Sequence, residues 1–320
     1  MKEFKSKLAQ YMIAAINEKR NNGYSYQEEE RAIKDFDTFI IKNNLDTGEI
    51  TREIIMKYGI QRHSESNNSR QDRLIRINSI ARYMNSLGIN AYISHNYGTR
   101  DKPIPYLPSK DQLHTFFIFV DNFKIKNKPY NRFLLEYSVI FRLYYCCGLR
   151  RSEALHLKID DVDLKQGTLT IVNSKRNKSR IVYMDESVRQ LCIKYNQSII
   201  ANYNHEKYFF PGQKATMPLS TGTINTHFRF YWEESQPQYL GKMPTVQSLR
   251  HCFITYKIDE WQASGVDVDS MIPYLSKYVG HSNIQQTYYY YHSLDARSLA
   301  VRNLVNKSNE AIPEVIKYEE

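Results

Sequence analysis

The chain has 320 residues, of which 42% are hydrophobic and 24% charged, and its formal net charge is +10 at pH 7. This size suits one large domain or two ordinary ones. No run of eighteen apolar residues occurs, so we expect no membrane span, and we expect no signal peptide at the N-terminus. The positive charge favours a polyanionic partner, because each Lys or Arg beside a phosphate releases a counterion, although a basic but ordinary enzyme has the same composition.

Residues 1–95 are predicted to form helices. Apolar residues at helical spacing predict helices over 6–20, 25–44 and 69–88, and residues 51–63 are compatible with another one. Ser25 is a candidate N-cap of the second helix. These residues therefore predict an all-helical N-terminal domain.

The helix predicted over 69–88 carries an arginine-rich face. Four arginines are spaced so that several share one side: Arg70, Arg73, Arg76 and Arg82. A solvated face explains this pattern, and so does a helix lying against phosphates. We take Arg73 and Arg76 as candidate nucleic-acid-binding residues.

A linker follows the helical region. Residues 96–112 contain three prolines and a glycine without any periodicity. We place the domain boundary near residue 103, with an N-terminal domain over 1–95, a linker over 96–108 and a second domain over 109–320.

The second domain is predicted to be mainly α with a small β-hairpin. Helices are expected over 109–123, with Ser109 as N-cap, and over 131–148, ending at Gly148. Two apolar runs, 168–172 and 181–184, flank a basic hairpin tip, and the chain after 185 is predicted to be mostly helical. The four cysteines show no metal-binding spacing, which indicates reduced, buried thiols in a cytosolic protein. The acidic stretch 160–163 is expected to form a turn and not a metal site.

Several short motifs carry candidate chemistry. Arg150 lies in "GLRRSE" at a turn between two predicted helices, the hairpin tip carries Lys175 and Lys178, and Arg250 lies in an apolar helical segment, "SLRH". A buried arginine without a partner is costly, but a snorkelling arginine at a helix end is the simpler explanation. Finally, "VGHSNIQQTYYYYH" places four tyrosines shortly after His281.

In this order and spacing the motifs resemble the tyrosine recombinases, also called phage integrases, of mobile-element type. The resemblance covers nearly the whole chain. It implies a helical, SAM-like core-binding domain followed by a mixed α/β catalytic domain with the DNA breaking-rejoining fold and a C-terminal tail helix. It also implies a site-specific recombinase, active in DNA integration or transposition, that cleaves and rejoins double-stranded DNA through a covalent 3′-phosphotyrosine intermediate.

The resemblance assigns roles to individual residues. Arg150 and Arg250 match the two catalytic arginines, Lys175 the catalytic lysine, His281 the late histidine and Tyr290 the nucleophile. Glu153 matches a supporting acidic residue, and Lys178 and Arg180 are expected to touch backbone phosphate.

One position departs from the family pattern. Gln247 stands where the family most often has histidine, and glutamine can donate a hydrogen bond but cannot carry a proton. His251 is adjacent to Arg250, but on a helix it points about 100° away. We therefore assign no role to His251 and expect His281 or a water to serve if a base is needed.

The resemblance also implies partners. We expect double-stranded DNA with an inverted-repeat core site, a tetrameric synapse in which C-terminal tails exchange between protomers, accessory DNA-bending proteins, no cofactor, no metal and a prokaryotic cytoplasmic location at the nucleoid. Two alternatives stay open: a DNA-binding protein of the same fold with weakened catalysis, which Gln247 favours, and a type IB topoisomerase.

Overall fold

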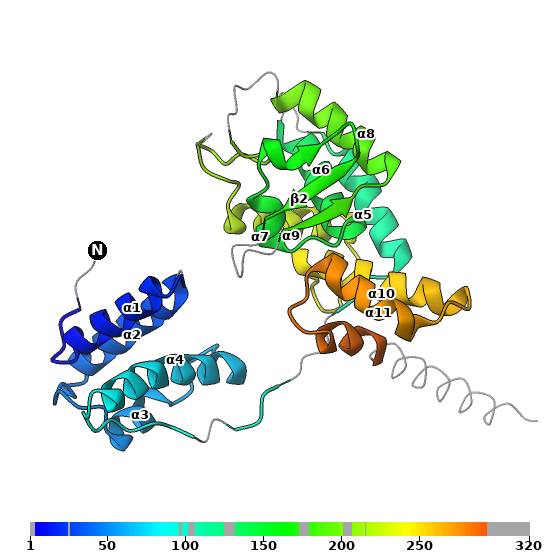
Figure 1. Cartoon of the computed structure of the whole chain (residues 1–320). Coiled ribbons are helices and arrows are strands. Elements are labelled where there is room, and N and C mark those ends of the chain that lie inside the picture. Colours follow the sequence, from blue (N-terminus) through cyan, green and yellow to red (C-terminus); the bar gives the residue numbers. More distant parts are fainter. Residues whose placement is uncertain are drawn as a thin grey trace, which may run out of the picture. The chain divides into compact units, whose positions relative to one another are not determined.

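The computed structural model describes residues 4–24, 26–95, 98–101, 106–124, 132–172, 179–200, 207–214 and 216–292. The chain divides into two compact units, Met1–Pro103 and Ile104–Glu320 (Figure 1). Ser25, the hairpin tip over 173–178 and the predicted tail helix beyond 292 lie outside the described residues.

The described residues of the first unit form four helices: α1 (Ala9–Asn21), α2 (Gln27–Lys42), α3 (Arg52–Tyr58) and α4 (Asn67–Ser86). The helix α4 packs against α1 and α2 around one apolar core. The helix α3 is shorter than the predicted range 51–63. It ends at Tyr58, and the N–H of the C-cap residue Gly59 donates to the Ile55 carbonyl.

Arg73 belongs to the interior of the first unit and not to a phosphate-binding face. Its Nε and Nη2 donate to the Glu65 carboxylate at 2.8 and 2.7 Å, and its Nη1 donates to the Tyr58 carbonyl. The guanidinium also lies over the Tyr58 ring. Arg73 is unsuited to phosphate binding because the donor groups of a buried arginine need hydrogen-bond partners inside the protein. Arg76, in contrast, is half-buried on α4.

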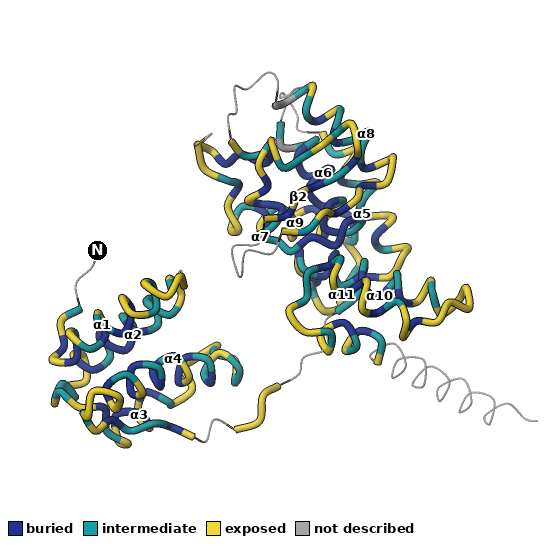
Figure 2. The backbone as a smooth tube through the Cα atoms, viewed as in Figure 1, coloured by how far each residue is buried: buried dark blue, intermediate teal, exposed yellow. Residues whose placement is uncertain are grey.

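The second unit is built around α6 (Arg132–Cys146). Its most extensive contacts are with three helices: α5 (Lys110–Asn122), α8 (Glu186–Tyr195) and α10 (Val246–Ala263). Figure 2 shows its buried residues at the centre of the unit. A capping box between Ser109 and Gln112 begins α5, as the sequence predicts.

A small antiparallel sheet lies beside these helices. It has the order β1 (Val162–Asp163), β2 (Thr168–Ile171) and β3 (Arg180–Tyr183), and Leu169 pairs with Val182. The remaining elements are α7 (Arg151–Leu155), the 3₁₀ turn Ile159–Asp161, the π-helical turn Asn196–Ile200, α9 (Thr221–Ser235) and α11 (Val268–Val279). Within the expected turn over 160–163, Asp160 and Asp161 belong to the 3₁₀ turn, whereas Val162 and Asp163 form the edge strand β1.

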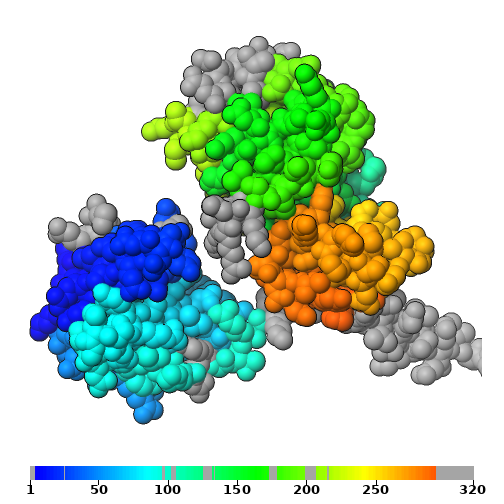
Figure 3. Space-filling view, viewed as in Figure 1, coloured from blue at the N-terminus to red at the C-terminus, as the bar shows by residue number. Residues whose placement is uncertain are grey.

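A second, smaller core positions the C-terminal segment. The last half of α10, α11 and the helical residues 285–292 enclose an apolar cluster that includes Ile254, Ile272 and Tyr290. In the space-filling view these segments, yellow to orange, form one continuous part of the unit (Figure 3). No helix in the described ranges is both long and apolar enough to span a membrane.

Candidate active site

Two glycine turns allow the predicted site residues to approach one another. Gly148 follows α6 with φ +63°, and Gly280 ends α11 with φ +71°, so both adopt the left-handed conformation that glycine tolerates best. A Cβ at Gly148 would lie 2.4 Å from the Phe253 ring, and one at Gly280 would lie 2.8 Å from Arg180 Nη1. Side chains from α10 (Phe253), from β3 (Arg180) and from the residue before α7 (Arg150) therefore pack directly against these backbone turns.

Glu153 fixes Arg150 through both its backbone and its side chain. The backbone N–H of Arg150 donates to Glu153 Oε2 at 2.7 Å, and Nη1 donates to Oε1 at 2.9 Å. Nη2 of Arg150 donates to the carbonyl of Gly280. The Arg150 side chain is 31% exposed, so part of the guanidinium faces solvent.

Arg180 lies differently from our expectation. Its Nη1 and Nη2 donate to the two oxygens of Glu153 at 2.9 and 2.8 Å, and its Nε donates to the Tyr278 carbonyl at 2.7 Å. Only 12% of the side chain is exposed. A bidentate carboxylate occupies the planar fork, so in this structure Arg180 supports Glu153, and its expected contact with backbone phosphate stays a prediction.

The cluster keeps an excess of positive charge. Burial opposes the ionisation of Glu153, but the hydrogen bonds and charges of Arg180 and then Arg150 outweigh it and lower the pKa of the carboxyl to about 2. Arg250 Nη1 lies 3.9 Å from the same carboxylate. Three arginines thus share one carboxylate, which leaves two positive charges to attract an anion.

Arg250 is buried in α10 between the two turns. Its Nη1 donates to the Gly148 carbonyl at 2.6 Å and its Nη2 to the Val279 carbonyl at 2.8 Å. Burial, followed by the charge of Arg150, lowers its pKa to about 10, so it remains charged at neutral pH. Hydrogen bonds to backbone carbonyls therefore offset the desolvation penalty of burying this arginine.

Tyr290 is the buried member of the four-tyrosine run. It is 8% exposed, whereas Tyr288 and Tyr291 are half-buried and Tyr289 is exposed. Burial raises the pKa of Tyr290 to about 12, although Arg250 and Arg150 act in the opposite direction. The phenol is therefore protonated in the structure and needs help to become a nucleophile.

His281 lies beside Tyr290, with the two rings stacked at a centroid distance of 6.1 Å. Its Nδ1 forms a hydrogen bond with Thr287 Oγ1 at 2.7 Å. Burial and the charges of Arg250 and Arg150 lower its pKa to about 3, so the imidazole is neutral.

His251 is the residue that the sequence reasoning missed. Its Nδ1 lies 2.6 Å from the hydroxyl oxygen of Tyr290. His251 and Arg250 do point in different directions from α10, as helix geometry predicts. Arg250 faces the turns at Gly148 and Gly280, and His251 faces the helix that carries Tyr290, so both side chains reach the site. A histidine in an otherwise apolar stretch of helix was the signal that could have found it.

Three further residues of the predicted site are Lys175, Lys178 and Gln247. Lys175 and Lys178 lie outside the described residues. Gln247 is half-buried in the first turn of α10, and its side chain makes no hydrogen bond with any residue in the described part of the chain.

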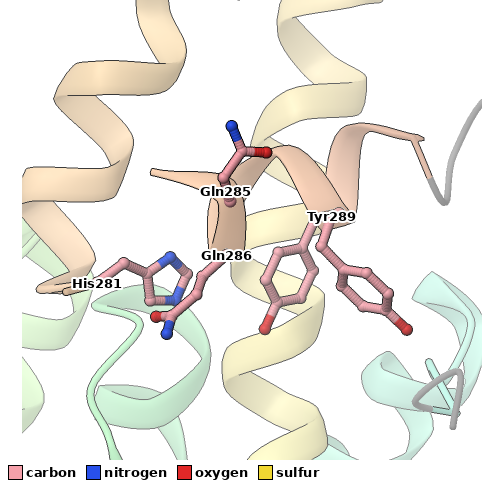
Figure 4. Close-up of a pocket in the computed structure, with 5 residues that line it drawn as sticks. His281, Gln285, Gln286 and Tyr289 are labelled. Carbon is pink, nitrogen blue, oxygen red and sulfur yellow. The ribbon is translucent and has the colours of Figure 1, made fainter. Parts of the chain in front are cut away.

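A pocket of about 440 Å³ opens at the tyrosine helix, lined by His281, Gln285, Gln286, Tyr289 and Tyr290 (Figure 4). The Gln286 side chain extends toward His281, and Gln285 points away from it. A second groove of about 820 Å³ begins at Arg150 and Glu153 and continues along β2. Gln286 lines both cavities, so the pocket at the tyrosine helix adjoins the groove at Arg150.

The acidic side chains of the stretch 160–163 and the cysteines form no metal site in the described residues. Asp161 and Asp163 accept backbone N–H groups of their own turns. Among the described residues no group of three or more His, Cys, Asp or Glu side chains is placed to bind a metal. No disulfide joins the four cysteines, all of which are described.

Comparison with known proteins decides the family. The sequence model of the phage integrase family matches residues 110–297, more than half of the chain. The chain belongs to the phage integrase family. A protein of Sinorhizobium fredii named as an integrase/recombinase is 29% identical to this chain over 304 residues, which span 91% of this chain and 93% of the relative. A tyrosine recombinase of Pseudothermotoga lettingae is 26% identical over 272 residues, spanning 82% and 85%.

Solved structures share the fold of this phage integrase. The integrase of transposon Tn1549, in complex with a circular intermediate DNA, aligns with a TM-score of 0.63 over 88% of this chain and 94% of its own, at 16% identity. The XerH recombinase bound to its difH substrate aligns with a TM-score of 0.61 over 83% and 77%, at 17% identity. The predicted family, fold class and recombinase enzyme class are confirmed, whereas the roles of individual residues stay predictions.

Proposed function

We propose that this phage integrase family member is a site-specific recombinase of mobile-element type in which Tyr290 attacks a DNA phosphodiester. The observation that carries the proposal is the placement of one buried phenol, selected from four consecutive tyrosines, beside a cluster with an excess of two positive charges. A phosphodiester is anionic, and the transition state of its cleavage concentrates charge on the nonbridging oxygens. Such a cluster stabilises that charge.

The proposed step forms one bond and breaks another. The oxygen of Tyr290 bonds to phosphorus while the bond to the 5′-oxygen breaks, and Lys175 of the hairpin tip gives that oxygen its proton. Arg150 and Arg250 donate to the nonbridging oxygens. The product is a 3′-phosphotyrosine, and attack by the 5′-hydroxyl of a second strand reverses the step without ATP.

His281 fits a hydrogen-bonding role in this scheme. When the Thr287 hydroxyl donates to Nδ1, the neutral ring keeps its proton on Nε2. That N–H is then available for a phosphoryl oxygen beside Arg150.

The partner of this chemistry is double-stranded DNA with an inverted-repeat core site. The net charge of +10 and the DNA complexes of the Tn1549 integrase and XerH support this assignment. In the proposal the first unit is the core-binding domain, the second is the catalytic domain, and a tetramer forms the synapse with accessory DNA-bending proteins. Exchange of C-terminal tails belongs to residues outside the described ranges.

A nicked suicide substrate tests the proposed function. The duplex is taken from the DNA that flanks the gene for this chain, with a nick beside the scissile phosphate, so that the cleaved product cannot be religated. We expect a covalent protein–DNA adduct on a denaturing gel. Tyr290→Phe should abolish the adduct, while the matched controls Tyr289→Phe and Tyr291→Phe should retain it.

The two alternatives give different results. A DNA-binding protein with weakened catalysis would bind the duplex without forming an adduct, and this result would contradict the proposal. A type IB topoisomerase would form the adduct and relax supercoiled DNA without exchanging partners, so sequencing of the products separates it from a recombinase. Adduct formation by Tyr290→Phe would show that another tyrosine is the nucleophile.

A further inference from the structure

The hydroxyl of Tyr290 has a specific neighbour on α10. His251 Nδ1 and the phenolic oxygen are 2.6 Å apart, and the two ring centroids are 5.5 Å apart with the planes tilted by 33°. Both side chains are largely shielded from solvent. A short, shielded hydrogen bond of this kind fixes the position of the phenolic oxygen.

The direction of this hydrogen bond follows from the protonation states. Burial, followed by the charge of Arg250, lowers the pKa of His251 to about 4, so the ring is neutral and has one acceptor nitrogen. Tyr290 keeps its proton, because burial raises its pKa. The phenol therefore donates to Nδ1, and His251 carries its own proton on Nε2.

The groups that face this pair are cationic or neutral. Arg250 lies on the same helix, Arg150 reaches in from α7, and His281 stacks on the other side of the tyrosine ring. A phosphodiester bound to the two arginines would offset their charge and raise the proton affinity of His251 at the moment of attack. Substrate binding thus prepares the histidine to accept a proton.

Gln247 cannot serve as such a proton acceptor. The residue three positions before Arg250 is an amide, which can donate or accept hydrogen bonds but cannot take up a proton near neutral pH. His281 has its Nδ1 committed to Thr287. Of the site's described side chains, His251 is the one in direct contact with the phenolic hydroxyl.

We propose that His251 is the general base for Tyr290. As the phenolic oxygen bonds to phosphorus, its O–H bond breaks and the proton moves to Nδ1 of His251, giving an imidazolium. The 5′-oxygen leaves with a proton from Lys175, and in the reverse step the imidazolium returns its proton to the departing phenol. This inference rests on the proposed function and adds to it the group that activates the nucleophile.

The test compares His251→Asn with wild type in single-turnover adduct formation on the suicide substrate. Asparagine places an amide oxygen close to the position of Nδ1 and keeps the hydrogen bond, but it cannot accept the proton. We expect the rate to fall by about 10²-fold or more, which is typical for loss of a general base. His114→Asn, an exposed position on α5, is the matched control and should keep the wild-type rate.

A sulfur-substituted substrate separates the base from the acid. When the leaving 5′-oxygen is replaced by sulfur, the leaving group no longer needs a proton, so Lys175→Ala should recover most of its activity. His251→Asn should stay slow on this substrate. Its rate should also rise steadily with pH, whereas the wild-type rate should level off once His251 is neutral.

Three results would overturn the inference. His251→Asn could react within about threefold of wild type, it could be rescued by the sulfur substrate, or it could keep the wild-type pH profile. DNA affinity and the thermal midpoint, measured on the same variant, show that it is folded, and His251→Gln provides a second variant. If wild type forms no adduct, the proposed function fails and this inference with it; if wild type reacts through Tyr290 and His251→Asn matches it, the inference alone fails.

Discussion

At the scale of single residues, Glu153 organises the arginine cluster. Its carboxylate accepts hydrogen bonds from Arg150 and Arg180 and lies within 4 Å of Arg250. Replacing it by glutamine keeps the shape but leaves three buried or half-buried cations without a counter-charge. We expect Glu153→Gln to lower the free energy of unfolding at pH 7 by on the order of 3 kcal/mol, measured by urea denaturation.

The pH dependence of this effect has a definite sign. The pKa of Glu153 is lower in the folded chain, at about 2, than its ordinary value of 4.5, so its stabilisation is complete above about pH 5 and is lost as the pH falls toward 2. The difference between wild type and Glu153→Gln should shrink over that window. Glu186→Gln is the control, because Arg189 also lowers the pKa of Glu186 to about 2, but this exposed pair is screened by water. An equal loss of unfolding free energy in both variants would contradict a stabilising role of Glu153 in the arginine cluster.

The sequence indicated several residues that lie together in the candidate site, but it missed His251 and could not supply their hydrogen-bond partners. Arg150, Arg250, His281 and Tyr290 lie close together in the structure. Arg150 precedes α7, His281 follows the turn at Gly280, and Arg250 and Tyr290 lie within helices. The carboxylate partner of Arg180 could not be predicted, because Glu153 is 27 residues away in the chain and belongs to another element. For His251, helix periodicity correctly predicted that its side chain points away from Arg250. The sequence could not show that the helix carrying Tyr290 packs on that side of α10.

At the scale of elements, the turn at Gly280 connects α11 to the site. Its carbonyl accepts a hydrogen bond from Arg150, and a Cβ there would lie 2.8 Å from Arg180 Nη1 and 3.1 Å from Arg150 Nη1. We expect Gly280→Ala to displace both guanidinium groups and to lower the rate of adduct formation at least tenfold. Single-turnover kinetics on the suicide substrate measures this effect.

Gly265 provides the matched control for Gly280. It has nearly the same backbone conformation, φ +72° against +71°, but no atom lies within 4 Å of an added Cβ. Gly265→Ala should therefore lose about 1 kcal/mol of stability from backbone strain and keep the wild-type rate. Equal rates for the two variants would show that the close approach at Gly280 does not position the arginines.

Elements were predictable where local chemistry sets their ends. Ser109 begins α5 through a capping box, and the two apolar runs of the hairpin became β2 and β3. The strand β1 was missed, because two residues carry too little pattern, and it exists only through pairing with β2. Long-range contacts, not local preference, decide such short elements.

At the scale of the whole molecule, the proposed function makes DNA affinity depend on salt. Each lysine or arginine that neutralises a phosphate contributes about −0.9 to the slope of log K against log salt concentration. Arg76 is a candidate contact in the first unit, because no ion pair or hydrogen bond holds its guanidinium among the described residues. Arg73, three residues earlier on α4, is held by Glu65 and Tyr58.

These two arginines give opposite predictions for the full chain. Arg76→Gln should weaken DNA binding and reduce the salt slope by about one, while the thermal midpoint stays unchanged. Arg73→Gln breaks a buried ion pair and should cost about 3 kcal/mol of stability in the first unit. Fluorescence anisotropy with labelled duplex at several salt concentrations, together with thermal unfolding of each variant, measures both effects. An unchanged slope for Arg76→Gln would remove this residue from the DNA-binding surface, because a phosphate contact cannot be lost without changing the number of counterions released.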